Sequence, residues 1–230
     1  MERSDKTLVD IPQSPTKVHA IVVPKIKEPL LKRPLDVILS TFMIILSAPV
    51  SLVIVLAIKL EDGGPIFYLQ DRWGRGGSHF KAYKFRTMVP HSDKIFGIKQ
   101  AKENDQRITR VGKLLRAMGL DELPQIINIL KGEMSFVGPR ALAVGEILYD
   151  ENGCRLNYEE IPDFWRRMSV RPGLTGISTI YRAKDISPRK KFRNDLLYIR
   201  KQSFWLDLRL IIMSFWISFR GKWESRQRKI

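Results

Sequence analysis

Two adjacent carboxylates and two arginines form the group of residues with the clearest chemical potential. Asp121 and Glu122 stand side by side, Arg116 precedes them, and Arg140 follows a Gly-Pro turn. Carboxylates bind Mg2+ or act as nucleophiles, and arginine forks hold phosphate oxygens. This combination predicts a site for a metal-bridged diphosphate, with the two acids as Mg2+ ligands or as a nucleophile.

Two predicted helices position these acids. Apolar residues repeat at helical spacing over 111–118 and stop at Gly119, and a second apolar pattern ends at Lys131-Gly132. Asp121 is predicted to cap the second helix, with Pro124 in its first turn, so that a phosphate can meet the free N–H groups there. The simpler alternative, that Asp121 is only a helix cap, stays open on local pattern alone.

A β-hairpin is predicted upstream of the acids. Two aromatic-rich runs, 66–69 and 80–85, are joined by a glycine-rich segment. The hairpin is either a solvent-facing element or one that turns its basic side chains toward phosphate. Those side chains are Arg72, Arg75, Lys84 and Arg86.

The longest apolar run covers 37–58, 22 residues without a charge. A straight helix of that length spans about 33 Å, enough to cross a bilayer. Pro49, close after Ser47, favours a break near the middle, and basic residues flank the run on both sides. A kinked spanning helix and a helix that enters and leaves on the same side both fit this pattern.

The apolar and charged residues of the C-terminal part predict an amphipathic helix over 196–219, followed by a basic tail. Trp and Phe with flanking Arg and Lys are typical of a helix lying in the membrane interface, and the tail adds attraction to anionic lipid. The alternative is a core helix of the domain.

Composition restricts the partners. The 230 residues carry 40 Lys plus Arg against 24 Asp plus Glu, a net charge of +16, which predicts an anionic partner. One cysteine, Cys154, excludes an intramolecular disulfide and a cysteine-based zinc cluster. Nucleic acid would explain the charge, but the apolar run and the lack of a base-reading motif count against it. A membrane-anchored scaffold that binds anionic lipid remains the non-catalytic alternative.

Residues 116–140, with the pattern R-x4-DELPQ-x2-N-x-LKGEMS-x-VGPR, resemble the signature of the bacterial sugar transferases, the monotopic polyprenyl-phosphate phosphoglycosyl transferases. The resemblance covers roughly 30–217. The chain is similar to the minimal form of that family, since no four-helix membrane domain precedes residue 30. Further matching motifs are KRPLD at 32–36, GPIFY at 64–68, KFRTM at 84–88 and VRPGLTG at 170–176.

The resemblance implies an enzyme that moves a sugar-1-phosphate from a UDP-sugar to undecaprenyl phosphate. Asp121 would be the nucleophile, Mg2+ would sit on the Asp121-Glu122 pair, and Asp195 would be a further active-site acid. It also implies a re-entrant membrane helix broken at Ser47 and Pro49, on the cytoplasmic face of the bacterial inner membrane. The phosphate-binding residues would be Arg116, Arg140, Lys84 and Arg86.

The expected fold is α+β, mostly helical, with a re-entrant membrane helix, a small β-hairpin and interfacial amphipathic helices. Its expected parts are a lead-in over 1–30, the membrane helix over 31–60, a catalytic domain over 61–195 and a C-terminal helix with a basic tail over 196–230. The sequence leaves the oligomeric state open.

Overall fold

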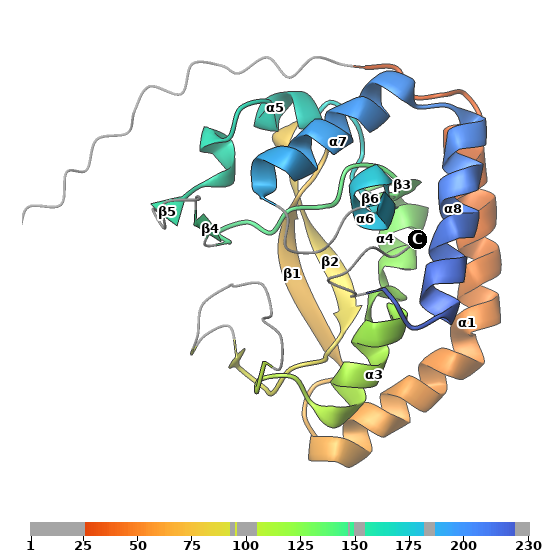
Figure 1. Cartoon of the computed structure of the whole chain (residues 1–230). Helices are drawn as coiled ribbons and strands as arrows, with labels where there is room; N and C mark the ends of the chain where they lie inside the picture. Colours follow the sequence, from red (N-terminus) through yellow and green to blue (C-terminus); the bar gives the residue numbers. More distant parts are fainter. Residues whose placement is uncertain are drawn as a thin grey trace, which may run out of the picture.

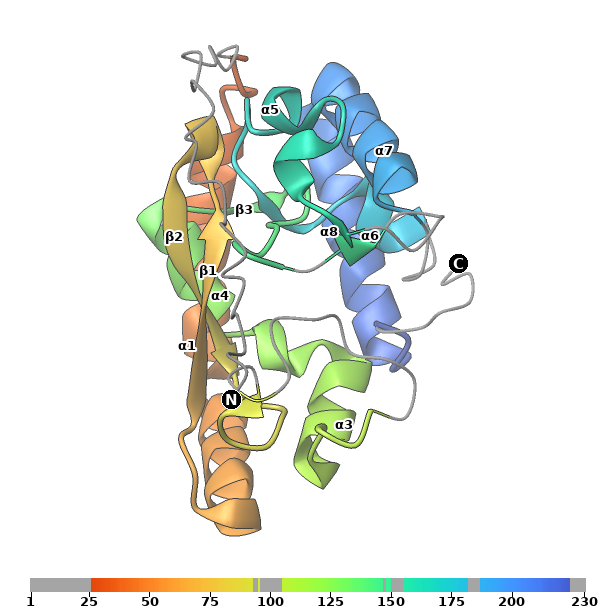
Figure 2. The ribbon, with the colours of Figure 1, turned by 90° about the vertical axis from the view of Figure 1, so that its left-hand side faces the viewer.

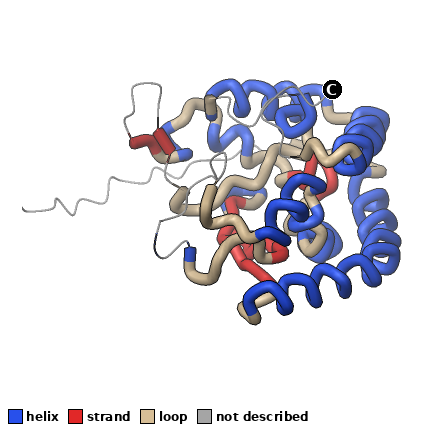
Figure 3. Tube along the Cα trace, turned by 60° about the horizontal axis from the view of Figure 1, so that its bottom comes forward, coloured by secondary structure: helices blue, strands red, loops and turns tan. Residues whose placement is uncertain are grey.

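A computed structural model describes residues 26–92, 95, 105–146, 148–149, 155–181 and 187–223. Most of the predicted lead-in, the basic tail after 223 and Cys154 lie outside these residues. The described chain is mostly helical, as the sequence predicts, and holds two further two-stranded sheets besides the predicted hairpin. Helix dominates the trace in Figure 3, and strand is confined to short segments.

The apolar run forms α1, Lys32–Asp62, which ends at Gly63 with φ 69°. Within the described residues, α1 alone is long and apolar enough to cross a membrane, and 11% of its most apolar window is buried. Pro49 lies inside it. Figure 1 shows α1 changing direction along its length, from an arm beside α8 (Phe204–Phe219) to an arm that reaches α3 (Arg110–Met118).

Both ends of α1 are bonded to the same globular body. At its start, Lys32 Nζ donates to Val137 O at 2.7 Å and is paired with Asp207 at 2.7 Å. At its end, Asp62 accepts two hydrogen bonds from Arg86, and the Glu61 carboxylate accepts from the backbone N–H groups that open α3. The middle of α1 is largely exposed apolar surface.

The predicted hairpin is confirmed. Strands β1, Phe67–Trp73, and β2, His79–Phe85, pair antiparallel with Phe67 opposite Phe85. The connection is a 3₁₀ turn, Arg75–Gly77, in which Gly76 and Gly77 have φ of 72° and 80°. Positive φ costs glycine nothing, which explains the glycine-rich segment. Figure 2 shows the hairpin covering one side of the molecule.

The predicted helix before the acids is also confirmed. It is α3, Arg110–Met118, with Thr109 as its N-cap and Gly119 as a left-handed C-cap. The second helix differs from the prediction. It is α4, Gln125–Lys131, its N-cap is Pro124, and Asp121 lies before it in a 3₁₀ turn, Leu120–Glu122. The prediction that Asp121 caps this helix is therefore wrong, because the chain makes a tighter turn first.

A short parallel pair, β3 (Ser135–Val137) and β6 (Gly173–Thr175), crosses behind the site. A Cβ on Gly138 would lie 2.6 Å from the Arg171 carbonyl, and one on Gly173 would lie 2.0 Å from the Gly138 nitrogen. The VGPR and RPGLTG segments therefore carry glycine where the two backbones touch. The bond from Gly173 N to Pro139 O holds this contact at 2.8 Å.

The C-terminal helix is divided rather than continuous over 196–219. Helix α7, Pro188–Lys201, ends at Gln202, and α8, Phe204–Phe219, restarts with Ser203 accepting a hydrogen bond from the Leu206 N–H. One face of α8 joins the main core, while its other face exposes apolar side chains. Smaller elements complete the fold: β4 (Leu148–Tyr149), β5 (Arg155–Leu156), a 3₁₀ turn (Tyr158–Glu160), α5 (Phe164–Arg167) and α6 (Ile177–Tyr181).

Candidate active site

The two acids lie in a buried turn directly after α3. Gly119, with φ 71°, reverses the chain, and Asp121 and Glu122 follow at 6% and 5% exposure. A Cβ on Gly119 would lie 2.8 Å from the Trp223 ring, and the Trp223 N–H donates to Ala117 O at 3.0 Å. The segment after α8 thus packs against the turn that positions the acids.

Glu122 is the buried centre of an ion cluster that Arg140 joins from the surface. Its Oε1 accepts from Lys84 Nζ at 2.8 Å and from Arg140 at 3.0 Å. Burial raises the pKa of Glu122, but Lys84 and Arg140 outweigh it and hold that pKa well below its ordinary value. Among the described residues no hydrogen-bond partner meets the other oxygen, Oε2, which is buried. Glu122 is therefore ionised, and its Oε2 can accept a further hydrogen bond or bind a cation.

Lys84 reaches this cluster from β2, and Arg72 approaches from β1. Burial lowers the pKa of Lys84, and Glu122 opposes the shift. Arg72 donates to the Ala141 carbonyl, and burial followed by the charge of Arg140 lowers its pKa. Both side chains point from the hairpin toward the acids, as one of the two interpretations of the hairpin expects.

The other predicted phosphate ligands are placed differently. Arg86 pairs with Asp62 at the end of α1, so its side chain holds that helix. Arg116 lies in the last turn of α3 and donates to Thr87 Oγ1 at 3.4 Å. Of the four predicted cations, Lys84 and Arg140 are thus the pair bonded to Glu122.

Asp195 is buried at 1% exposure and bonded within the fold. It accepts from Arg167 Nε at 2.6 Å and from Ser178 Oγ at 2.7 Å. Arg167 also donates to the carbonyl of Arg140. Asp195 therefore reaches the site through Arg167, which supports the backbone of Arg140. No sequence signal singled out Arg167, because its role depends on contacts with distant residues.

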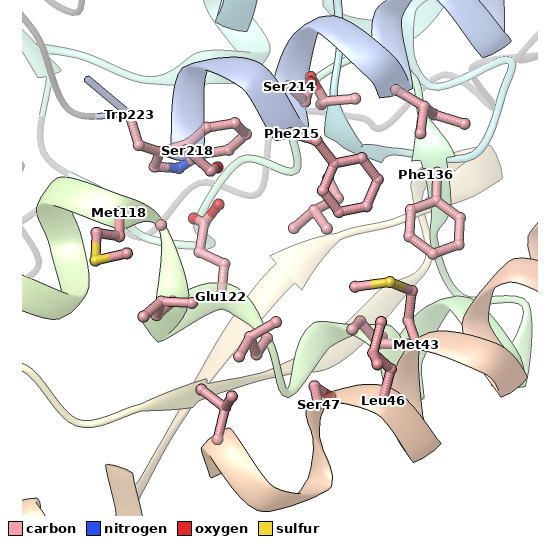
Figure 4. A pocket seen from close by; sticks show the side chains of 18 residues that line it. Met43, Leu46, Ser47, Met118, Glu122, Phe136, Ser214, Phe215, Ser218 and Trp223 are labelled. Atoms are coloured by element: carbon pink, nitrogen blue, oxygen red, sulfur yellow. The ribbon is translucent and has the colours of Figure 1, made fainter. Parts of the chain in front are cut away.

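A partly open cavity of about 290 Å³ lies between α1, α8 and the acid turn. Its walls are mostly apolar, and Glu122 is the one charged residue among the lining residues described. Figure 4 shows Glu122 on one side of the cavity, with Ser47 and Leu46 of α1 and Phe215 and Ser218 of α8 around it.

The described residues contain no group of three or more His, Cys, Asp or Glu side chains that could hold a metal ion by themselves. Mg2+ in phosphoryl-transfer sites typically needs less, one or two carboxylates together with substrate phosphates and water. The buried, unpartnered Oε2 of Glu122, next in sequence to the Asp121 carboxylate, fits such a ligand set.

Comparisons with known proteins agree with this geometry. The family model described as "Bacterial sugar transferase" matches residues 27–221. The "Exopolysaccharide production protein PSS" of Rhizobium leguminosarum is 38% identical over 187 residues, covering 79% of this chain and 92% of the relative. The "UDP-glucose:undecaprenyl-phosphate glucose-1-phosphate transferase" of Klebsiella pneumoniae is 40% identical over 214 residues, covering 87% of this chain and 44% of the relative.

A relative of the same printed name from Caulobacter vibrioides is 38% identical over 195 residues, 83% of this chain and 70% of the relative. The chain thus spans most of two of these relatives and less than half of the third. The motifs, the site geometry and these matches lead to one conclusion: the chain belongs to the bacterial sugar transferase family and is a transferase.

Proposed function

We propose that the protein transfers a sugar-1-phosphate from a UDP-sugar to undecaprenyl phosphate and releases UMP, as the first membrane step of glycan assembly. The names of the relatives support these substrates. The observation that carries the proposal is the ion cluster in which Glu122 binds Lys84 and Arg140 beside Asp121. A lipid-binding scaffold gives no reason for two adjacent acids, one of which keeps a buried carboxylate oxygen without a partner among the described residues.

Asp121 is the proposed nucleophile. One of its carboxylate oxygens forms a bond to the phosphorus that bears the sugar, the bond from that phosphorus to the bridging oxygen breaks, and UMP leaves with the electron pair. An oxygen of the lipid phosphate then attacks the same phosphorus and frees the carboxylate. Lys84 and Arg140 stabilise the charge on the phosphate oxygens, and Arg72 adds to the positive field.

Glu122 and Asp121 are the proposed ligands of Mg2+. When bound, the ion would neutralise the diphosphate and favour departure of UMP. Glu122 itself keeps Lys84 and Arg140 in place through Oε1, which leaves Oε2 for the metal. Asp195 acts indirectly. It holds the Arg167 side chain, and Arg167 in turn donates to the backbone carbonyl of Arg140.

We further propose that α1 is re-entrant and that both of its ends face the cytoplasm. Lys32 at one end and Asp62 at the other are bonded to the same globular body, which supports placing them on one side of a membrane. Pro49 lies inside α1, and a proline within a helix is a usual cause of a change of direction such as the one in Figure 1. The exposed apolar middle of α1 would then enter the inner membrane, and the site would lie near the lipid phosphates.

The test is release of UMP from a panel of UDP-sugars in the presence of Mg2+ and undecaprenyl phosphate. We expect one donor to support release by the wild type and Asp121→Asn to lose at least about 10³-fold in rate, as enzymes do when a nucleophile is removed. Asp71→Asn is the matched control, because Asp71 is an exposed residue of β1 paired with Lys81. Unchanged release by Asp121→Asn would remove Asp121 as the nucleophile.

A further inference from the structure

The cavity beside the acids has two unlike ends. Leu46, Val50 and Phe215 line it and are 58%, 44% and 46% exposed, so its rim continues into the apolar outer surface of α1 and α8. Glu122 and Phe136 line it at 5% exposure each. The cavity therefore leads from an apolar surface to the charged cluster.

Three of the four hydroxyl groups along the wall, those of Ser47, Thr175 and Ser214, are hydrogen-bonded to each other or to the backbone. Thr175 Oγ1 lies 2.5 Å from Ser214 Oγ, and Ser214 donates to Leu210 O at 2.8 Å. A sugar or nucleotide placed here would bury many polar groups that lack partners, which is costly. An apolar chain with an anionic head fits, because its head would lie at the Glu122 end, where Lys84 and Arg140 stand behind the cavity wall and offset the charge of the carboxylate.

We propose that this cavity binds the first isoprene units of the polyprenyl phosphate acceptor, those next to its phosphate. The inference rests on the proposed function and specifies where its lipid substrate binds. An apolar cavity of about 150 Å³ accepts one benzene ring. The 290 Å³ available here is about twice that and suits roughly two five-carbon isoprene units, with the remainder of the chain leaving over the exposed rim.

The first test compares acceptors with one, two, three and eleven isoprene units. We expect the acceptor KM to fall by about tenfold or more from one unit to two, since burial of apolar carbon is favourable, and to change little beyond three. Val50→Phe, which adds volume to the cavity wall, should raise the KM of the longer acceptors by about tenfold and remove the gain from the second unit.

Val53→Phe is the matched control. It makes the same change on the same helix at a residue that is 66% exposed and does not line the cavity. UMP release from the donor in a single turnover without acceptor should be equal in the wild type and Val53→Phe. If the wild type releases no UMP even with acceptor present, the proposed function fails. If it does, and both variants keep the acceptor KM of the wild type, the cavity assignment fails.

A second measurement uses the wild type alone and does not depend on any variant folding. A two-unit prenyl phosphate with a photoreactive group on its second unit, the one farther from the phosphate, should label α1 near Leu46 and α8 near Phe215, as mapped by mass spectrometry. Excess polyprenyl phosphate should abolish this labelling, and excess phospholipid should not. Labelling confined to other segments, or equal competition by phospholipid, would overturn the assignment.

Discussion

Two ion clusters, each centred on a buried side chain, differ in how completely that side chain is hydrogen-bonded. Lys32 donates its three ammonium protons to Val137 O, Tyr198 Oη and Asp207 Oδ2, at 2.7, 2.9 and 2.7 Å. Tyr198 in turn donates to Asp207 at 2.7 Å, and burial together with Asp207 raises its pKa well above the ordinary value. Every proton of Lys32 has an acceptor, so this cluster has nothing left with which to bind a ligand.

The Glu122 cluster is bonded on one side only. Lys84 and Arg140 share Oε1, while Oε2 is buried without a partner among the described residues. An unpaired buried carboxylate oxygen is costly unless a ligand completes it. The comparison indicates that the first cluster fastens α1 to the body, whereas the second leaves one carboxylate oxygen available to the proposed substrate and metal.

Lys32→Met should break the first cluster and lower the stability more than the other two variants proposed below. It leaves Asp207 buried without its cation, and removal of one member of a buried ion pair costs about 3–5 kcal/mol. Thermal unfolding in detergent measures the loss, with Lys59→Met, an exposed residue of the same helix, as the control. The folded fraction should still release UMP. A normal melting temperature with no UMP release would instead place Lys32 in catalysis.

Glu122→Gln, in the second cluster, should reduce the rate of UMP release more than the stability, the reverse of Lys32→Met. The amide keeps an oxygen for Lys84 and Arg140 but loses the charge for a metal, so we expect a rate loss of about 10²–10³-fold and a smaller change in melting temperature than for Lys32→Met. UMP release measured across Mg2+ concentrations checks this, with the exposed Glu159→Gln as the control. A variant that needs no more Mg2+ than the wild type would argue against Glu122 as a metal ligand.

Lys84→Arg should have the smallest effect on the rate of UMP release at neutral pH. Its main effect should be on the pH dependence of that rate. Burial lowers the pKa of Lys84, so its charge is lost, as pH rises, earlier than in an exposed lysine, and activity should decline on the alkaline side. Arginine stays protonated throughout this range, so the alkaline decline should disappear or move to higher pH. Kinetics of UMP release from pH 7 to 10 provide the measurement. An unmoved alkaline limb would assign that decline to another group.

The features that the sequence predicted correctly are set by interactions between residues close together in the chain. The hairpin, α3 and its stop at Gly119 follow from side-chain period and from glycine at positive φ, which act over a few residues. The acids, the two arginines and the apolar run could be identified as functional candidates for the same reason. The family motifs extend over most of the described chain and led to the same conclusion as the comparisons.

Tertiary structure alone decided which of these residues meet. Lys84 and Glu122 are 38 residues apart and Arg86 prefers Asp62, although both cations come from the same strand end. The turn that removes Asp121 from the helix cap follows Gly119, and Trp223, 104 residues later in the sequence, packs directly against that glycine. Sequence patterns report period and propensity, whereas ion pairs, cavities and close backbone contacts depend on distances between segments that only the packed chain sets.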